Sequence, residues 1–288
     1  MAAGRFAPSP SGDLHVGNLR TALVAWLRAR STDSTFLLRV EDLDRVRPGA
    51  EQRQLEDLAA LGLDWDRPVV RQSERARFYD AALASLAGRG LTYECYCTRR
   101  EILDAPSAPH APLGAYPGTC RDLTETEREH RRASRPAALR LRAEVSEFEI
   151  DDLLHGHVTG PVDDVVLRRG DGVVAYNLAV VVDDAQQRVK EVVRGDDLLS
   201  SAPRQAYLAR LLGATPPAYA HIPIALNADG QRLAKRDGAV TLREIGSGTF
   251  RVIAASLGLE GSSPADLLAS FDLAALPREP WVFTPQGQ

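Results

Sequence analysis

Residues 5–18 combine amino-acid types that suit phosphate binding. Residues 5–7 have the character of a short buried strand, and a Pro/Ser/Gly turn at residues 8–12 leads into a helix with an apolar stripe. A helix that begins after such a turn has unpaired backbone N–H groups at its positive end, where a phosphate is favoured. Gly17 lets a phosphate or a flat ring approach the backbone there, and His15 can donate to phosphate oxygens. An ordinary loop with a surface histidine would show the same pattern.

Two charged residues at the ends of predicted strands complement each other. Glu41 follows the strand expected at residues 35–40, and Arg194 ends a strand that begins at Val192. Ligands of open parallel sheets bind outside the carboxyl ends of the strands, so we expect both residues at one rim with residues 5–9. Glu41 could accept hydrogen bonds from an α-ammonium group, and Arg194 could hold a carboxylate by two N–H groups. The pair suits a zwitterionic ligand with an extra carboxylate, although salt bridges to neighbours would explain both residues.

A cationic loop lies near the C-terminus. Residues 231–236, with the sequence Gln-Arg-Leu-Ala-Lys-Arg, follow Asp229-Gly230. A lysine in such a loop, here Lys235, could neutralise the β- and γ-phosphates of ATP as pyrophosphate leaves. A solvated run of charge is the alternative.

Composition limits the possible function classes. The chain has 288 residues, of which 44% are hydrophobic and 26% charged, and no apolar run approaches the length that spans a bilayer. Because the N-terminus has no apolar signal segment, we expect a cytoplasmic globular protein. The net charge of −4 excludes wholesale wrapping of nucleic acid but permits a local basic patch. Three cysteines, two of them as Cys95-x-Cys97, favour a metal site over disulfides.

The elements that must position these residues alternate between strand and helix in the first half, which is typical of a parallel α/β sheet. The alternation breaks at Cys95 and resumes before Val192, and the residues after Thr249 are too few for an independent domain. We therefore expect a Rossmann-type domain in two halves, 1–94 and 173–248, an inserted subdomain, 95–172, and a helical C-terminal segment, 249–288.

Four segments in order resemble the signatures of class I glutamyl-tRNA synthetases, and together they place the resemblance over about residues 5–245. The first signature is residues 6–18 (FAPSPSGDLHVGN), the glutamate-binding strand is 39–44 (RVEDLD), a later motif is 193–198 with 203–205, and the Lys-Met-Ser-Lys-Ser loop is 232–236. The resemblance implies a class I Rossmann-type parallel sheet with an inserted subdomain similar to zinc-binding and acceptor-binding modules.

The resemblance also implies a site for ATP with Mg²⁺ and for L-glutamate, in which His15 and Lys235 are catalytic. The implied ATP-binding residues are Pro8, His15, Gly17, Asn18, Arg232 and Lys235. The implied glutamate-binding residues are Arg5, Phe6, Ala7, Pro8, Ser9, Glu41, Tyr176 and Arg194. A core aromatic is the alternative for Tyr176.

For the cysteines, the resemblance implies one structural Zn²⁺ per chain, held by Cys95, Cys97, Cys120 and the unusual phenolate ligand Tyr116. His110 is the chemically more ordinary fourth ligand. Reduced cysteines without a metal are the alternative.

The sequence departs from the family at two points. Arg232 and Ala234 replace the first lysine and the serine of the loop, and we expect no anticodon-binding region after Thr249, because the residues that follow leave no room for one. The shortened architecture resembles the glutamyl-Q tRNA(Asp) synthetases, a paralogous group that attaches glutamate to the queuosine base in the anticodon of tRNA(Asp). This implies that the partner is the tRNA(Asp) anticodon loop, and we expect a monomer.

Three alternatives stay open at this stage. A compact glutamyl-tRNA synthetase would charge the 3′ end of tRNA(Glu). A non-catalytic paralogue that binds tRNA or glutamate would explain the altered loop. A small-molecule nucleotidyltransferase would share the His-x-Gly-x turn but leaves Glu41, Arg194 and the cysteines unexplained.

Overall fold

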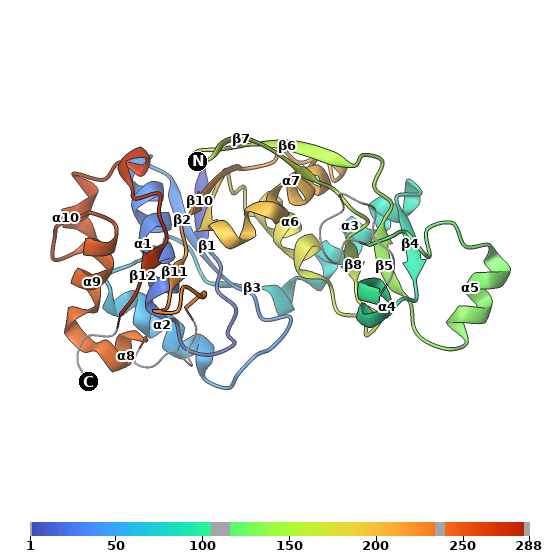
Figure 1. Ribbon diagram of the computed structural model, residues 1–288, viewed down its shortest axis with the longest axis horizontal. Coiled ribbons are helices and arrows are strands. Elements are labelled where there is room, and N and C mark those ends of the chain that lie inside the picture. Colours follow the sequence, from blue (N-terminus) through green and yellow to red (C-terminus); the bar gives the residue numbers. More distant parts are fainter. Residues whose placement is uncertain (1, 105–115, 234–239, 285–288) are drawn as a thin grey trace.

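The computed structural model describes residues 2–104, 116–233 and 240–284, and its centre is a mostly parallel sheet (Figure 1). One half pairs β1, β2 and β3 in parallel, and the other pairs β9, β10 and β6 in parallel, with β7 antiparallel at the edge. The halves meet where the Lys190 N–H donates to the Ala3 carbonyl oxygen at 2.9 Å. The strands are β1 (Ala3–Phe6), β2 (Thr35–Val40), β3 (Val70–Arg71), β6 (Glu147–Asp152), β7 (Gly156–Pro161), β9 (Glu191–Gly195) and β10 (Ala218–Ile222).

The order β3-β2-β1-β9-β10-β6-β7 places the topological switch point between β1 and β9. In open α/β sheets a ligand crevice forms at such a point, outside the carboxyl ends of the strands. The expected Rossmann-type parallel sheet is therefore confirmed.

Alternation along the strands sends apolar and charged side chains to opposite faces of this sheet. Phe36 and Leu38 of β2 pack with α1 (Val16–Ser31), whose predicted apolar stripe is buried. Arg39 of β2 lies on the other face and bonds to Asp184 of α6 (Tyr176–Gln186). That face also carries α7 (Ala202–Leu211), which follows η2 (Asp196–Ser201). The two helices therefore cover the face on which the buried arginines of the sheet lie.

The remaining helices of the first half are α2 (Ala50–Ala60), η1 (Gln72–Arg75) and α3 (Ala76–Gly88). Helix α3 packs against α6, and its Tyr79, Leu83 and Leu86 belong to the same buried cluster as apolar residues of α6 and α7. Gly62 follows α2 with a φ of 78°, a backbone conformation that favours glycine.

Strands at residues 92–95, 138–141 and 166–168 form a second, antiparallel sheet, and α5 lies at the far end of the molecule from the C-terminal helices (Figure 1). Its elements are β4 (Thr92–Cys95), β5 (Ala138–Leu141) and β8 (Val166–Arg168), with α4 (Arg99–Asp104) and α5 (Glu125–Arg132). The β6–β7 hairpin leaves this region and pairs with β10 of the main sheet through Asp152 and Tyr219. A hairpin from the middle of the expected insertion thus extends the Rossmann-type sheet.

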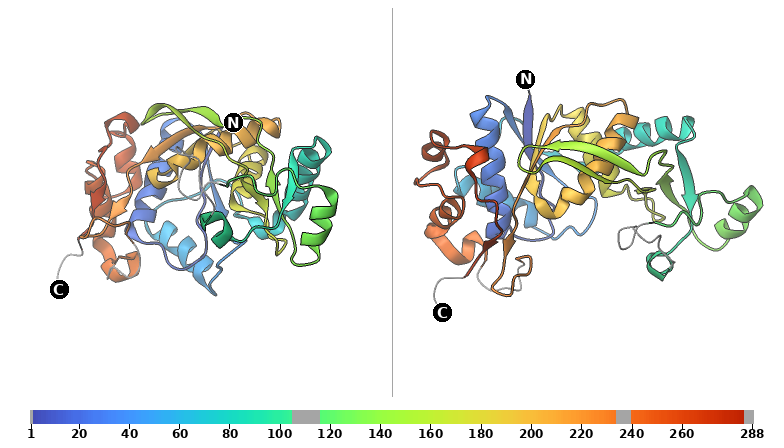
Figure 2. Two further views of the ribbon diagram at one scale, coloured as in Figure 1. Left: turned by 45° about the vertical axis from the view of Figure 1, so that its right-hand side comes forward. Right: turned by 45° about the horizontal axis from the view of Figure 1, so that its top comes forward.

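The C-terminal segment packs on α1 (Figure 2). It contains α9 (Thr249–Ser256), α10 (Pro264–Leu268) and η5 (Leu273–Ala275), and it follows α8 (Leu242–Ile245) and η4 (Gly246–Gly248). It also adds a strand, β12 (Trp281–Val282), parallel to β11 (Ala225–Leu226). Over the described parts of the chain, none of the helices has the length and apolar character needed to cross a bilayer.

Candidate active site

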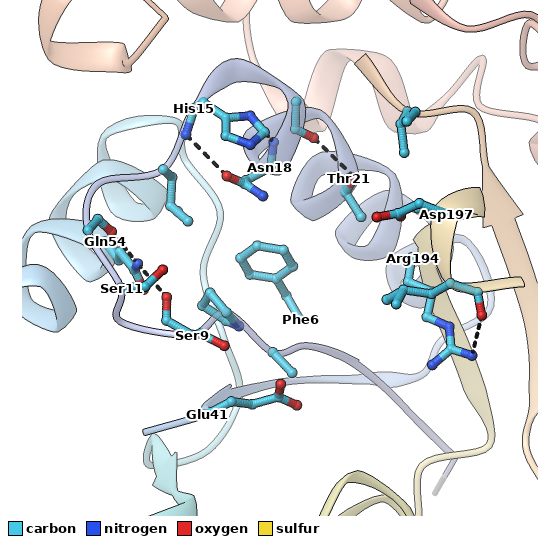
Figure 3. Close-up of a pocket in the computed structure, with 18 of the residues that line it drawn as sticks. Phe6, Ser9, Ser11, His15, Asn18, Thr21, Glu41, Gln54, Arg194 and Asp197 are labelled. Carbon is cyan, nitrogen blue, oxygen red and sulfur yellow. Dashed lines mark hydrogen bonds between the residues drawn. The ribbon is translucent and has the colours of Figure 1, made fainter. Parts of the chain in front are cut away.

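A cavity of about 540 Å³ opens at the carboxyl ends of β1, β2 and β9, beside the start of α1 (Figure 3). Of the residues predicted to bind ATP or glutamate, those that line it are Phe6, Ala7, Pro8, Ser9, His15, Gly17, Asn18, Glu41, Tyr176, Arg194 and Arg232. Thus the structure brings together residues from both ends of the sequence. Two predicted residues are not among them: Arg5 does not line the cavity, and Lys235 lies outside the described residues.

His15 is the N-cap residue of α1. Its Nδ1 accepts the backbone N–H of Asn18 at 3.3 Å, and its own N–H donates to Asn18 Oδ1 at 3.2 Å, which makes a reciprocal capping box. Because Nδ1 is the acceptor, the neutral ring carries its proton on Nε2. The cap therefore selects the tautomer with which His15 can donate to a phosphate oxygen.

Gly17 is required by close packing at the cavity wall. A Cβ at this position would lie 2.9 Å from the Ala225 Cβ and 3.0 Å from the His15 ring. Gln54 of α2, which the sequence reasoning missed, fixes the preceding turn by donating to the carbonyl oxygens of Ser9 and Gly12, at 3.0 and 2.6 Å. Gln54 is 2% exposed, and its type, one polar residue among several in α2, does not indicate that burial.

The described residues on either side of 234–239 form hydrogen bonds at this site. On one side the Leu233 N–H donates to the Ala225 carbonyl oxygen at 2.9 Å, and on the other the Val16 N–H donates to the Val240 carbonyl oxygen at 2.8 Å. Arg232 lines the cavity and pairs with Asp197 at 2.5 Å. The described residues that flank 234–239 in the sequence therefore lie close to the start of α1.

Glu41 lies at the floor of the cavity, with only 10% of its side chain exposed. Arg39 Nη2 donates to Glu41 Oε1 at 3.4 Å. Burial raises the pKa of Glu41, and the charges of Arg39 and Arg5 offset only part of that rise. An ammonium group from a ligand would complete the neutralisation of this carboxylate.

Arg5 is buried beneath the cavity. Its Nε donates to Asp184 Oδ1 at 3.3 Å, and Asp184 also accepts from Arg39 Nη1 at 2.7 Å. The two arginines lower the pKa of Asp184 more than its burial raises it. Asp184 was missed from the sequence, because an acidic residue inside an apolar helix gives no sign of which strand it will face.

Arg194 and Tyr176 form the opposite side of the cavity. Figure 3 shows His15, Glu41 and Arg194 arranged around the ring of Phe6. Arg194 is 5% exposed, whereas Tyr176, the first residue of α6, exposes 41% of its surface. The core-aromatic alternative for Tyr176 therefore does not describe its position.

A second cavity of about 700 Å³ adjoins the first and shares Ser9, Glu41, Arg45 and Tyr176 with it. Five arginines and three carboxylates line it: Arg45, Arg99, Arg140, Arg169, Arg204, Glu41, Asp44 and Asp163. The excess of cations beside the first cavity suits an anionic molecule larger than an amino acid.

The three cysteines converge, as the sequence predicted. Their sulfur atoms all lie within 4.8 Å of one another, with Cys97 and Cys120 3.5 Å apart. The Tyr116 hydroxyl lies 3.3 Å from Cys95 Sγ and 3.8 Å from Cys97 Sγ. Burial raises the pKa of the Cys97 thiol to about 12. A cation bound between these groups would favour the ionised thiols and so lower their pKa. Three sulfur atoms and a phenol oxygen are a donor set that fits a thiophilic metal. The other candidate ligand, His110, lies outside the described residues.

Comparison with known proteins identifies relatives over nearly the whole chain. The family model for the catalytic domain of class I tRNA synthetases (E and Q) matches residues 2–266. The glutamyl-Q tRNA(Asp) synthetase of Nocardia farcinica is 68% identical, with 99% of this chain and 94% of the relative covered. That of Deinococcus radiodurans is 49% identical, with 87% and 86% covered.

Among solved structures, the glutamate-tRNA synthetase of Elizabethkingia anophelis is similar, with a TM-score of 0.83 at 26% identity. The similarity covers 98% of this chain and 68% of that chain. The glutamate tRNA ligase of Elizabethkingia meningosepticum in complex with its amino acid has a TM-score of 0.82, also at 26% identity, with 98% and 67% covered.

Proposed function

The chain belongs to the class I tRNA synthetases (E and Q), and from that membership we propose that it activates L-glutamate with ATP and transfers the glutamyl group to the queuosine base in the anticodon of tRNA(Asp). The observation that carries this proposal is the single cavity that joins the start of α1 with Glu41, Arg194 and Arg232. It offers donors for a triphosphate and charges of both signs for an amino acid.

In the first step, the α-carboxylate of glutamate attacks the α-phosphorus of ATP, and pyrophosphate leaves. The N–H groups at the start of α1, the His15 Nε2–H and the cationic loop with Arg232 and Lys235 stabilise the charge on the phosphates, together with the Mg²⁺ that accompanies ATP. Glu41 receives the α-ammonium group and Arg194 a carboxylate, while Tyr176 lines the amino-acid position. Positioning of this kind removes about 7–11 kcal/mol of barrier in favourable cases.

In the second step, a hydroxyl of the queuosine cyclopentenediol attacks the glutamyl carbonyl carbon, and AMP leaves. The second, arginine-rich cavity is the place from which this hydroxyl approaches, because it shares Glu41 and Tyr176 with the first. Single-stranded loops with unstacked bases are the usual targets of sequence-specific RNA recognition. A single anticodon loop requires only such a local cationic surface, so the negative net charge of the chain does not prevent binding. We further propose that the protein acts as a monomer in the cytoplasm.

Zinc is the metal that we assign to the cysteine cluster, with Cys95, Cys97, Cys120 and Tyr116 as ligands. Zn–S bonds of about 2.3 Å around a tetrahedral ion place sulfur atoms about 3.8 Å apart. The observed 3.5 Å between Cys97 and Cys120 requires little adjustment. The ion would fix the second sheet and has no part in the chemistry.

The proposal is tested with tRNA(Asp) that contains or lacks queuosine, incubated with ATP and labelled glutamate, followed by mass analysis of the digested RNA. We expect glutamate on the queuosine nucleoside only. Label on the 3′ end of tRNA(Glu) would instead indicate a compact glutamyl-tRNA synthetase. Absence of glutamate-dependent ATP–pyrophosphate exchange would indicate a non-catalytic paralogue.

A further inference from the structure

Arg194 is a buried cation whose partners are all neutral. Its Nε donates to His221 Nε2 at 2.9 Å, its Nη1 to Gln205 Oε1 at 2.7 Å and its Nη2 to the Leu198 carbonyl oxygen at 3.3 Å. Among the described residues, no carboxylate forms an ion pair with it. Arg5 and Arg39, on the same face of the sheet, both pair with Asp184. Because buried charges are normally paired, the counter-ion of Arg194 must come from a ligand.

His221 of β10 orients Arg194 without neutralising it. The Arg194 Nε can only donate, so His221 Nε2 must accept and His221 Nδ1 must carry the ring proton. That Nδ1–H donates to Asp152 Oδ2 at 2.6 Å, and the imidazole is fully buried. The neutral ring therefore stands between the carboxylate of Asp152 and the guanidinium of Arg194.

Asp152, the last residue of β6, fixes this tautomer. Its Oδ1 accepts the N–H groups of Leu154 and His155 at 2.8 and 3.0 Å, and its Oδ2 accepts the backbone N–H of His221 at 3.1 Å. Both oxygens are thus held as acceptors. Asp152 comes from the β6–β7 hairpin, so a segment from the middle of the chain acts on Arg194 through His221.

We propose that His221, held by Asp152, is a positioning residue for glutamate: it fixes the plane of Arg194 so that one N–H on each terminal nitrogen meets a carboxylate of the amino acid. This inference rests on the proposed function. Gln205 completes the arrangement from α7, and its amide donates in turn to Asn177 Oδ1 at 2.9 Å. Three neutral acceptors leave the positive charge of Arg194 to the ligand.

The test is the KM for glutamate in ATP–pyrophosphate exchange, with His221→Leu and His221→Gln compared. Leucine removes the acceptor for Arg194, and we expect the KM for glutamate to rise at least about 10-fold while the KM for ATP changes less than about 2-fold. Glutamine can accept from Arg194 and donate to Asp152, and it should restore most of the affinity. An unchanged KM for glutamate in a folded His221→Leu protein overturns the inference, as does an equal rise in both KM values.

The exposed pair His157 and Asp151 of the same hairpin, with Nδ1 and Oδ1 3.2 Å apart, supplies the matched control. His157→Leu should leave both KM values as in the wild type. If the wild-type protein itself shows no exchange, the proposed function fails, whereas exchange that is insensitive to His221 defeats only the positioning role.

Gln205→Glu provides a second, isosteric test that does not depend on the stability of the leucine variant. It places a carboxylate against Arg194 without moving it, so we expect the KM for glutamate to rise by about 10-fold or more through competition for the same cation. Wild-type affinity in this variant would show that the charge of Arg194 is not reserved for the ligand.

Discussion

At the scale of single residues, the start of α1 tolerates no side chain at position 17. In Gly17→Ala the new Cβ would displace the His15 ring, so we expect kcat/KM for ATP to fall at least about 10-fold. Overpacking costs about 1–3 kcal/mol, but replacing a helical glycine returns up to about 1 kcal/mol, so stability should change less than activity. Exchange kinetics and thermal unfolding measure the two effects.

Gly88 provides the control for this substitution, since it also lies in a helix and a Cβ there meets nothing within 4 Å. Gly88→Ala should leave exchange unchanged and keep or slightly raise the unfolding temperature. Equal losses in the two variants would contradict the role assigned to close packing at Gly17.

Glu41 predicts a pH dependence of glutamate binding. Burial raises its pKa, so it takes up a proton at a higher pH than an ordinary glutamic acid does. Protonation removes the negative charge that receives the α-ammonium group, so the KM for glutamate should rise as the pH falls through this raised pKa. Binding of glutamate favours the ionised form, so it should release protons at mildly acidic pH.

The measurement is the KM for glutamate as a function of pH, with the KM for ATP as the internal reference. Glu41→Gln should have a high KM for glutamate at every pH and lose the acidic rise. A parallel pH profile in the wild type and in Glu41→Gln would exclude Glu41 as the titrating group.

At the scale of elements, the second sheet couples the cysteine cluster to the arginine-rich cavity. The Arg140 guanidinium of β5 lies 3.6 Å from the centre of the Tyr116 ring and also lines that cavity. We expect Cys97→Ser, or treatment with a chelator, to remove the metal and lower transfer to RNA at least about 10-fold, while exchange changes less than about 3-fold. Metal content by mass spectrometry and the two activity assays test this. Exchange that falls as far as transfer would place the metal's effect at the first cavity instead.

At the scale of the whole molecule, the C-terminal segment packs against α1 and β11, which both contribute residues to the first cavity. Phe283 is buried in the core with α1, and its N–H donates to the Leu226 carbonyl oxygen at 2.8 Å. Phe283→Ala should lower the free energy of unfolding by about 3 kcal/mol and raise the KM for ATP, because β11 carries Ala225 at the cavity wall. The neighbouring Val282 is 52% exposed, and Val282→Ala should cost less than about 0.5 kcal/mol in the same denaturant titration. Equal losses would contradict the structural role of Phe283.

The sequence by itself determined the parts of the site that are local. The turn before α1, the His15 cap with Gly17, and Glu41 at the end of β2 follow from punctuation and strand periodicity, which act over a few residues. The Cys95-x-Cys97 spacing likewise predicted that these two cysteines contribute to one cluster, because a single residue separates them at the end of β4.

Only the tertiary structure decided which distant side chains meet. Asp184 pairs with Arg5 and Arg39. Of these three residues, only Arg5 belonged to the predicted site, and it is buried below the cavity rather than lining it. Asp152 reaches His221 because the β6–β7 hairpin pairs with β10, a contact for which a short strand gives no partner signal. The physical reason is that strand pairing and side-chain burial depend on sheet order. Sheet order is set by the packing of helices on both faces and not by any local pattern.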